Sequence, residues 1–586
     1  MDEKVLQLKE EYKQKISRLN DYLWTAGLTE PVSRIQQMSF LFFLKMLEEQ
    51  DTALEKEAQL TKRTYKSIFS GKNEKYRWSN WIHKTGKELF NFVRDEVFPF
   101  MENISNGREN IRRMFYGAKL LIPDEVTLKK SLDVIDEIDF SQLDADVKGD
   151  LYEDLLNQIK AAGELGQFLT PRHIIRYIVA MINPKIGETV FDPACGTGGF
   201  LLAAYEWIKL KNSDSKLIYE YNGVKRGPGD KLSKEQWEFL QNKTFFGQDV
   251  SPEMVRLTLM NFFLHGLEES DIKRKDTVAS PEDEEDLRRY DVIMTNPPFA
   301  GKVDKERIKK SLPIKSTKTQ ILFLGYVIDA LKPNGRGGII LPEGVLFGTN
   351  RDDKEIRRYL LEKCQLQAVV SMPAGVFQPY SGVKTSVLIF KKKIQPKLDE
   401  GEKIWFFNMQ GDGSSLSKAK KFGSQYRNDI PKLLELWNKN RAIEKPYSWL
   451  TPVKEIIEND YILSANAYNP YIGGEEEKHR DPEVILEEIK IWEEKAKLSI
   501  EEFARLMHYD TLKGHIEAAV AGREKLETVA KTITTYLKKN YINRNDLTEI
   551  FDEVEKDSVE AFRKYGGKFD YEGRKKRFNE LKINTV

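Results

Sequence analysis

The chain has 586 residues, of which 93 are basic and 92 acidic, and its formal net charge is +1. This length exceeds what one domain usually holds and predicts about three to four domains. A protein that gripped DNA alone would usually be more basic, so the balance favours local basic patches or a partner that supplies much of any DNA contact.

The sequence carries no pattern typical of export, membrane insertion or metal binding. Charged residues open the chain, which predicts no signal peptide, and the longest apolar run, 40–44, is far too short to span a bilayer. The two cysteines, Cys195 and Cys364, and the six scattered histidines have no metal-ligand spacing. We therefore expect a cytoplasmic protein with no membrane contact and no metal.

The N-terminal stretch, residues 1–160, reads as helical. Pro31 can start a helix, because proline suits the first helical turn. The residues behind it are apolar at helical spacing, with further apolar residues between them: Val32, Ile35, Met38, Leu41, Phe42 and Met46. The pattern predicts a widely buried helix.

From residue 161 onward strands alternate with helices, which predicts a mostly parallel sheet. The strand candidates are 190–191, 244–250, 291–295, 337–341, 367–372, 385–391 and 404–408. We expect the last two to form an antiparallel pair at one edge. Residues 212–235 are polar and Gly-rich and read as an insertion.

A glycine-rich turn follows the first of these strands. Residues 189–200 read Thr-Val-Phe-Asp-Pro-Ala-Cys-Gly-Thr-Gly-Gly-Phe and lead into a helix over 200–208. Glycines there let the backbone approach a ligand, although plain tight turns share the pattern. No Gly-Lys-Ser/Thr follows, so the turn is not a Walker A loop. The next strand ends in Asp249, where an open α/β sheet can hold ribose hydroxyls.

The strand 291–295 stops at Asn296-Pro297-Pro298-Phe299, because proline has a fixed φ and no N–H for the ladder. The side-chain carbonyl of Asn296 and the backbone carbonyl of Pro297 can both accept hydrogen bonds, and Phe299 offers a flat apolar face. Two acceptors and a stacking ring suit a planar heterocycle with an exocyclic amino group. The motif therefore predicts alkylation of such an amine.

Together these motifs resemble those of S-adenosylmethionine-dependent N6-adenine DNA methyltransferases. Gly166-Gln-Phe-Leu-Thr-Pro-Arg172, just upstream of the glycine turn, matches the gamma arrangement of that family and its segment over the cofactor. Further matches at Asp276-Thr277, residues 322–347 and residues 382–387 make the chain most similar to the modification subunits of type I restriction–modification systems. The resemblance spans roughly residues 1–470.

The resemblance implies a Rossmann-like class I methyltransferase sheet at 161–475, flanked by an N-terminal helical domain at 1–160 and a C-terminal helical region at 476–586. It implies an adenine-specific DNA methyltransferase in which Asn296, Pro297, Pro298 and Phe299 act on a flipped-out base. The residues implied to hold S-adenosyl-L-methionine are Gly166, Gln167, Phe168, Leu169, Thr170, Pro171, Asp192, Ala194, Gly196, Thr197, Gly198, Gly199, Asp249 and Asp276.

The family also implies partners: double-stranded DNA, a specificity subunit that joins two copies of this chain, and a restriction subunit. An apolar stripe between residues 512 and 537 is typical of either a core-facing helix or a helix that binds such a partner. Alternative functions are a self-sufficient adenine methyltransferase, an RNA guanine-N2 or protein glutamine methyltransferase, and a non-catalytic scaffold. The last is disfavoured because both core motifs are intact.

Several charged or reactive residues have two readings. The lysines that follow Asn-Pro-Pro-Phe suit either phosphate contact or a solvated loop: Lys302, Lys305, Lys309, Lys310, Lys315 and Lys318. We expect Arg357 and Arg358 to be surface charges, and Cys195 to be a small packing residue rather than a nucleophile.

Overall fold

A computed structural model describes residues 3–61, 65–104, 109–138, 152, 156 and 170–471, without 222, 268, 280, 379–380 and 418–419. Met1–Ile472 forms one unit of the chain. The domain boundaries predicted at 160 and 475, the helical region at 476–586 and its apolar stripe lie outside the described residues, so they stay predictions.

The described N-terminal part is helical, as predicted. Its elements are α1 (Glu3–Thr25), α2 (Pro31–Thr61), η1 (Gly71–Tyr76), α3 (Trp78–Trp81), α4 (Gly86–Phe92), η2 (Val93–Val97), α5 (Phe98–Glu102), α6 (Glu109–Phe115) and α7 (Glu125–Asp136). Helix α2 begins at Pro31, where the Glu30 carboxylate accepts the backbone N–H of Val32 at 3.1 Å and thus caps the helix. Ile35, Met38 and their apolar neighbours are buried, which confirms the widely buried helix.

A nine-stranded sheet forms the centre of the second half, in the order β11-β10-β8-β9-β7-β6-β1-β4-β5. The strands are β1 (Val190–Asp192), β4 (Phe245–Asp249), β5 (Asp271–Arg274), β6 (Tyr290–Thr295), β7 (Leu331–Pro342), β8 (Cys364–Ser371), β9 (Thr385–Lys392), β10 (Lys403–Asn408) and β11 (Ser448–Pro452). Only β9 and β11 run antiparallel to their neighbours. The predicted mostly parallel sheet is therefore confirmed.

The predicted edge pair of 385–391 with 404–408 is wrong. Strand β9 lies between β7 and β8, antiparallel to both, whereas β10 pairs in parallel with β8. The first six residues of β9 are buried, as an internal strand requires. The edge position belongs instead to β11, which pairs antiparallel with β10 and was not recognised in the sequence.

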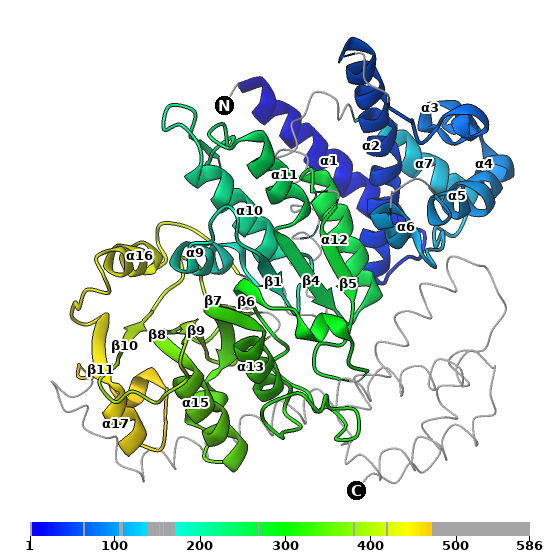
Figure 1. Cartoon of the computed structure of the whole chain (residues 1–586). Coiled ribbons are helices and arrows are strands. Elements are labelled where there is room, and N and C mark those ends of the chain that lie inside the picture. Colours follow the sequence, from blue (N-terminus) through cyan, green and yellow to red (C-terminus); the bar gives the residue numbers. More distant parts are fainter. Residues whose placement is uncertain are drawn as a thin grey trace, which may run out of the picture. The chain divides into compact units, whose positions relative to one another are not determined.

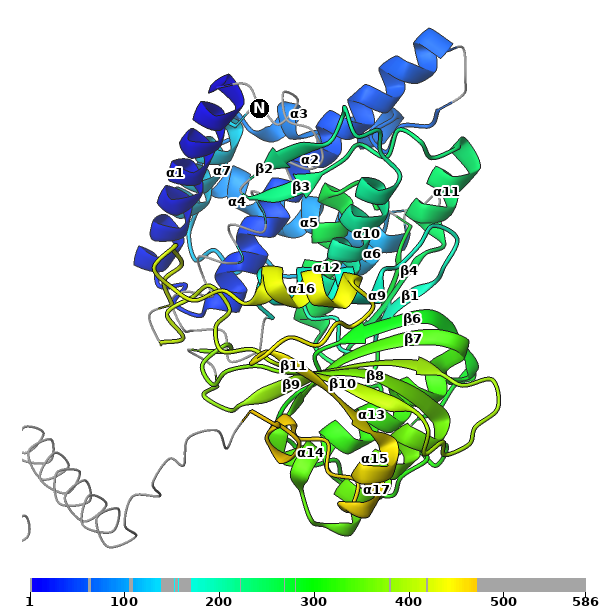
Figure 2. The same ribbon diagram turned by 90° about the vertical axis from the view of Figure 1, so that its left-hand side faces the viewer.

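Helices cover both faces of the sheet (Figures 1 and 2). One face carries α9 (Arg172–Ile182), α10 (Gly199–Lys211), α12 (Pro252–Leu264) and α16 (Ile430–Asn438), and the N-terminal helices share its apolar core. The other face carries α13 (Thr319–Ala330), α14 (Glu343–Phe347), α15 (Arg351–Lys363) and α17 (Val453–Glu458). The sheet thus separates two apolar cores.

The remaining described elements are a hairpin, β2 (Tyr219–Tyr221) with β3 (Val224–Arg226), inside the predicted insertion, then α11 (Lys234–Asn242), η4 (Glu284–Leu287) and η5 (Ala465–Ala467). Among the described residues, no helix combines the length and the apolar character needed to cross a membrane.

Candidate functional site

The predicted site residues gather where parallel strands end. Strand β1 lies between β6 and β4 and is parallel to both, so the glycine turn, Asp249 and Asn296 all follow carboxyl ends at one edge of the sheet. Open α/β sheets bind ligands at this edge, in the crevice where the strand order reverses. The topology therefore brings together motifs that are about a hundred residues apart in the sequence.

The glycine turn has a backbone that only glycine tolerates well. Gly196 and Gly198 have φ values of 54° and 80°, in the left-handed region. A Cβ added at Gly198, the N-cap of α10, would lie 2.7 Å from Cε1 of Phe262. The turn therefore needs glycine for its conformation and for its packing against α12.

Helix α12 and Asp249 fix the glycine turn by hydrogen bonds. Thr258 donates to the carbonyl of Gly196, and Asn261 Nδ2 donates to the carbonyl of Thr197 at 3.0 Å. The Asp249 carboxylate accepts the N–H of Gly196 at 3.0 Å. Both helix residues were missed in the sequence, because nothing in their spacing links them to a loop sixty residues upstream.

Two carboxylates stand beside this turn. Asp192 is fully buried at the end of β1, accepts the N–H of Ala194 at 3.0 Å, and has its pKa raised to about 7 by burial. Burial also raises the pKa of Asp249, whose oxygens accept the N–H groups of Gly196 and Ser251. A cationic ligand group would favour the charged form of each carboxylate.

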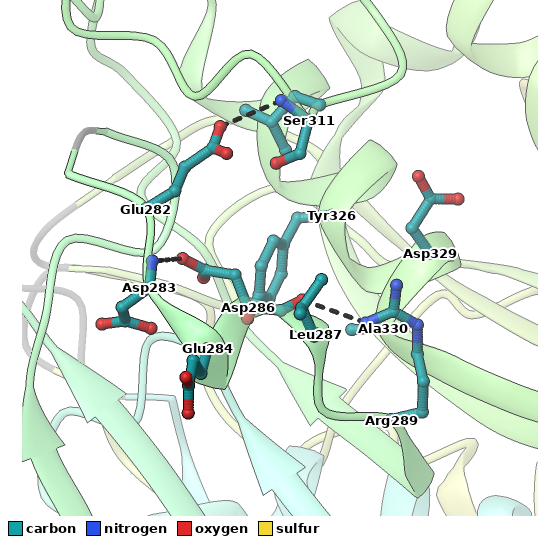
Figure 3. Close-up of a pocket in the computed structure, with 11 residues that line it drawn as sticks. Glu282, Asp283, Glu284, Asp286, Leu287, Arg289, Ser311, Tyr326, Asp329 and Ala330 are labelled. Atoms are coloured by element: carbon teal, nitrogen blue, oxygen red, sulfur yellow. Dashed lines mark hydrogen bonds between the residues drawn. The ribbon is translucent and has the colours of Figure 1, made fainter.

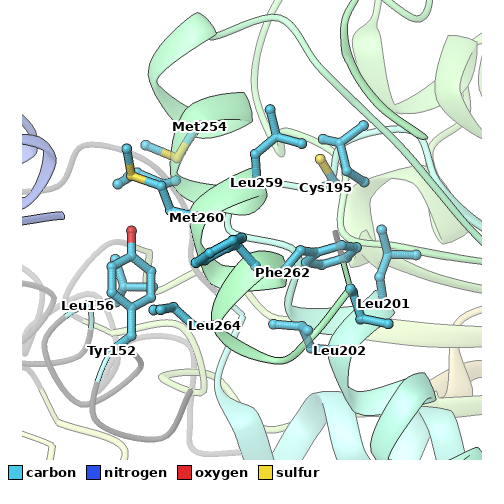
Figure 4. Packing of buried hydrophobic residues seen from close by; sticks show 14 of the residues in the cluster. Tyr152, Leu156, Cys195, Leu201, Leu202, Met254, Leu259, Met260, Phe262 and Leu264 are labelled. Carbon is cyan, nitrogen blue, oxygen red and sulfur yellow. The ribbon is translucent and has the colours of Figure 1, made fainter. Parts of the chain in front are cut away.

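Cys195 packs among apolar side chains of α10 and α12 (Figure 4). Burial raises the pKa of its thiol well above the ordinary value, so the sulfur is protonated at neutral pH. A protonated, buried thiol is a poor nucleophile, which agrees with the predicted packing role.

The amide of Asn296 is held in one orientation. Its Nδ2 donates to Thr170 Oγ1 at 2.9 Å, while its Oδ1 is buried and has no hydrogen-bond partner among the described residues. A buried acceptor without a donor costs about 1–3 kcal/mol, so a ligand that brings a donor to this oxygen gains binding energy there. The site therefore presents one unused acceptor beside the buried Pro297.

Phe299 lies next to this acceptor but is only 7% exposed. Its ring meets that of Phe377 edge to face, with 5.1 Å between centroids, and its carbonyl accepts the Gln320 side chain. Phe377 and Gln320 were missed, although Phe377 lies just before the motif at 382–387. The predicted stacking of Phe299 on a base stays a prediction, and so does a role for the exposed Pro298.

The upstream block is described only from Thr170, so Gly166, Gln167, Phe168 and Leu169 lie outside the described residues. Thr170 accepts a hydrogen bond from Asn296, and Pro171 is the N-cap of α9; the predicted cofactor contacts of both residues stay predictions. Arg172 contacts the glycine turn, since its guanidinium donates to the carbonyl of Gly199 at 3.3 Å.

Asp276 lies in the turn that follows β5. Its carboxylate accepts the N–H groups of Val278 and Ala279 at 3.2 and 3.1 Å, and so stabilises its own turn. The next residue, Thr277, donates to the carbonyl of Pro193 in the glycine turn at 2.6 Å. The segment after β5 is therefore tied to the site, and a direct role for Asp276 stays a prediction.

Two of the six lysines after the motif are paired with carboxylates, and the buried one, Lys309, cannot face a phosphate. Lys309 is buried and paired with Asp286 at 2.8 Å, and Lys318 is paired with Asp353 at 2.8 Å. The other four are exposed: Lys302, Lys305, Lys310 and Lys315. The prediction for Arg357 is wrong, because this side chain is 1% exposed and donates to four backbone carbonyls.

Comparison with known proteins gives two family matches. A family described as N-6 DNA Methylase matches residues 143–480, and the HsdM N-terminal domain matches residues 12–138. The EcoEI methylase subunit of a type I restriction enzyme from Escherichia coli is 32% identical over 485 residues, which are 79% of this chain and 90% of that protein. The EcoKI methylase subunit from Escherichia coli K12 is 27% identical over 427 residues, or 70% and 74% of the two chains.

Two solved structures of type I systems are also similar to this chain. A chain from a structure on complex assembly of the type I R-M system has a TM-score of 0.62 and 29% identity, covering 85% of this chain and 99% of that one. A type I modification subunit from Vibrio vulnificus has a TM-score of 0.61 and 25% identity, covering 76% and 93%.

The sheet, the glycine turn and the Asn-Pro-Pro-Phe turn define a Rossmann-like methyltransferase. The chain belongs to the N-6 DNA methylase family, as a methylase subunit of the type I restriction–modification class. This confirms the family resemblance and disfavours the alternatives of an RNA guanine or protein glutamine methyltransferase.

Proposed function

We propose that the chain transfers a methyl group from S-adenosyl-L-methionine to N6 of an adenine flipped out of double-stranded DNA, as one subunit of a type I restriction–modification complex. The observation that carries the proposal is the unused Oδ1 of Asn296. A flipped adenine brings a donor to that acceptor, since its N6 amino group has two hydrogens.

The residues beside the glycine turn fit the cofactor chemically. Asp249 already accepts two N–H groups, and each carboxylate oxygen has a further lone pair for a ribose hydroxyl. Asp192 is a buried carboxyl whose charged form a cation would stabilise. When bound, the cofactor supplies a methyl group already activated on a sulfonium. The direct contacts of Gly196, Thr197, Gly198, Gly199 and Ala194 with it form part of the proposal.

The chain's own task is alignment. Asn296 Oδ1 and the carbonyl of Pro297 accept the two N6 hydrogens, which turns the nitrogen lone pair toward the methyl donor. Thr170 keeps Oδ1 facing the base, because it occupies Nδ2 at 2.9 Å. These hydrogen bonds strengthen as positive charge develops on N6, so they stabilise the transition state more than the ground state. No protein base is needed, because the proton can leave to water.

We further propose that the chain needs partners. Its net charge of +1 is low for a protein that finds a DNA site alone. In the proposed complex two copies join one specificity subunit, and a restriction subunit completes the assembly. Four apolar residues lie near the subunit contact or in the core beside it: Leu526, Val529, Ile533 and Leu537. Each copy then methylates one strand of the target in the cytoplasm.

The test mixes the purified chain, labelled S-adenosylmethionine and genomic DNA, with and without the candidate specificity subunit. We expect site-specific labelling only with the partner, and its loss when residues 510–586 are removed, while cofactor binding remains. Full site-specific labelling by the chain alone would instead identify a self-sufficient methyltransferase.

A further inference from the structure

A cavity of about 560 Å³ lies at the carboxyl end of β7, and the proposed methyl transfer does not use it. Six of its lining residues matter for what it can bind: Glu343, Phe347, Val383, Lys384, Ser464 and Asn466. We call it the Phe347 cavity.

The Phe347 cavity lies at the same edge of the sheet as the target motif. Strands β6 and β7 are parallel, and Thr295, the last residue before Asn296, is opposite Ile339. Glu343 lies four residues beyond Ile339, or about 13 Å at the usual rise of a strand. A spacing of this size corresponds to a few nucleotides of a DNA strand.

Side-chain contacts connect the target motif with the segment beside the Phe347 cavity. Thr319 Oγ1 donates to the carbonyls of Pro298 and Gly301 at 3.5 and 3.4 Å, and the neighbouring Lys318 is paired with Asp353. Asp353 in turn packs against Gly348, where an added Cβ would lie 2.5 Å from its carboxylate. The exposed lysines of residues 302–315 therefore belong to a loop whose end meets the turn after Phe347.

The walls of the cavity are held rigidly. The buried Arg357 donates to the carbonyls of Val345, Gly348 and Tyr461 at 2.8, 2.9 and 2.7 Å, and so ties α14 to the segment before residue 462. Ser464 Oγ donates to Glu343 Oε2 at 2.8 Å, which joins two of the lining residues. With the Asp460 carbonyl, Arg357 binds four backbone carbonyls and so stabilises the backbone next to the lining residues Phe347 and Ile462.

The lining suits an unpaired nucleotide. Phe347 and Val383 are 51% and 49% exposed, which is unusual for large apolar residues that share one cavity. Lys384 beside them can contact a phosphate, and Asn466 offers an amide to a base edge. An aromatic face with a neighbouring cation is the pattern of single-stranded nucleic-acid sites.

A second cavity serves as a contrast. It has a volume of about 370 Å³ and contains Glu282, Asp283, Glu284, Asp286 and Asp329 among its lining residues (Figure 3). Such a lining repels phosphate. Its Leu287 is 73% exposed, so this cavity also has an exposed apolar side chain, but one surrounded by carboxylates that disfavour DNA binding.

We propose that the Phe347 cavity takes an unpaired base of the target strand that flanks the flipped adenine, with Phe347 stacked on the base and Lys384 at its phosphate. This inference rests on the proposed function, because the target strand is the DNA strand that carries the methylated adenine. The bound flanking base holds the strand open while the adenine is in the active site.

The test measures the binding of a fluorescein-labelled single-stranded oligodeoxynucleotide of about eight nucleotides to the full chain by fluorescence anisotropy. We expect Phe347→Ala to weaken binding about tenfold and Phe347→Trp to restore it, since stacking carries this contact. Lys384→Gln should lower the salt dependence by about one charge. The control, Leu287→Ala, should bind as the parent chain does, and thermal unfolding checks that each variant is folded.

Three outcomes decide the matter. Equal oligonucleotide affinity in the parent chain and Phe347→Ala overturns the proposal. So does a variant that binds the oligonucleotide normally but fails to assemble with the specificity subunit, because the cavity then serves a protein partner. The failure of the proposed function looks different: Asn296→Ala would then retain methylation, whatever Phe347→Ala does to binding.

Discussion

The two halves of the site differ in which group is left without a hydrogen-bond partner. On the β1–β4 side, Asp249, Thr258 and Asn261 bind three backbone groups of the glycine turn, and the buried oxygen that has no partner among the described residues, Oδ1 of Asn261, belongs to the supporting helix α12. On the β6 side, Asn296 has a fixed amide and a buried oxygen with no partner within the described part of the chain. We therefore expect the first half to keep its shape whether or not the cofactor is bound, whereas in the second half the substrate would supply the donor that Asn296 lacks.

The strongest test of this difference is Asn296→Ala. Because the unused oxygen acts mainly in the transition state, we expect the turnover number to fall by about 10³ or more, while cofactor affinity stays unchanged. Radiolabelled methyl transfer with the assembled complex measures the first quantity and calorimetry the second. Thr170→Val is the matched control: it removes only the group that orients the amide and should cost much less. Near-normal turnover in Asn296→Ala would mean that this motif does not hold the target.

On the other half, Gly198→Ala should damage the shape itself. The substitution introduces a left-handed residue with a Cβ 2.7 Å from Phe262, so we expect about 2–4 kcal/mol of lost stability, together with loss of cofactor binding. Gly187→Ala has a similar φ of 89° but nothing within 4 Å of the added Cβ, so it measures the backbone cost alone. Denaturant unfolding gives both values, and equal values would show that contact with α12 is unimportant.

Asp249→Ala should weaken the binding of S-adenosylmethionine by about 1–3 kcal/mol, through the lost ribose contact and the released Gly196 N–H. Asp249→Asn separates the two causes, because its amide oxygen can still accept the N–H of Gly196 although its charge is gone. Unchanged cofactor affinity in both variants, measured by calorimetry, would remove Asp249 from the site.

The smallest effect concerns pH. Burial raises the pKa of Asp192 to about 7, so the carboxyl is largely protonated at pH 6 and largely charged at pH 8. Since a cationic cofactor prefers the charged form, its affinity should rise up to about tenfold over this interval. The same raised pKa makes the fold bind its proton more tightly than the unfolded chain, so this group's contribution to stability falls as pH rises from about 4 to 7. Asp192→Asn should remove the pH dependence of affinity, and a slope that persists in this variant would assign it to another group.

The sequence predicted the candidate chemical groups of the site better than the residues that hold them in place. Asn296, Asp249 and the glycine turn were recognisable because each follows a short strand and has an unusual local composition. Thr258, Asn261 and Phe377 were not, since their roles depend on which helix or loop packs against the turn. Arg357 shows the limit most clearly: one arginine in a charged helix looks like any other until the four carbonyls around it are known.

For the sheet, too, local features were predicted better than those that depend on tertiary packing. Strands with runs of apolar residues were found, but the order was wrong at one edge, because β9 and β10 look alike in sequence and only tertiary pairing puts β9 between β7 and β8. The short β5, and β11 with its proline end, had too little pattern to be recognised.

The stretch Thr170–Pro171–Arg172 touches both halves of the site: Thr170 holds the amide of Asn296, and two residues later Arg172 grips the carbonyl of Gly199. A displacement of this stretch therefore changes both halves at once. We therefore expect cofactor binding and base capture to be energetically coupled through this stretch, so that a bound cofactor changes the affinity for DNA and bound DNA changes the affinity for the cofactor by the same factor.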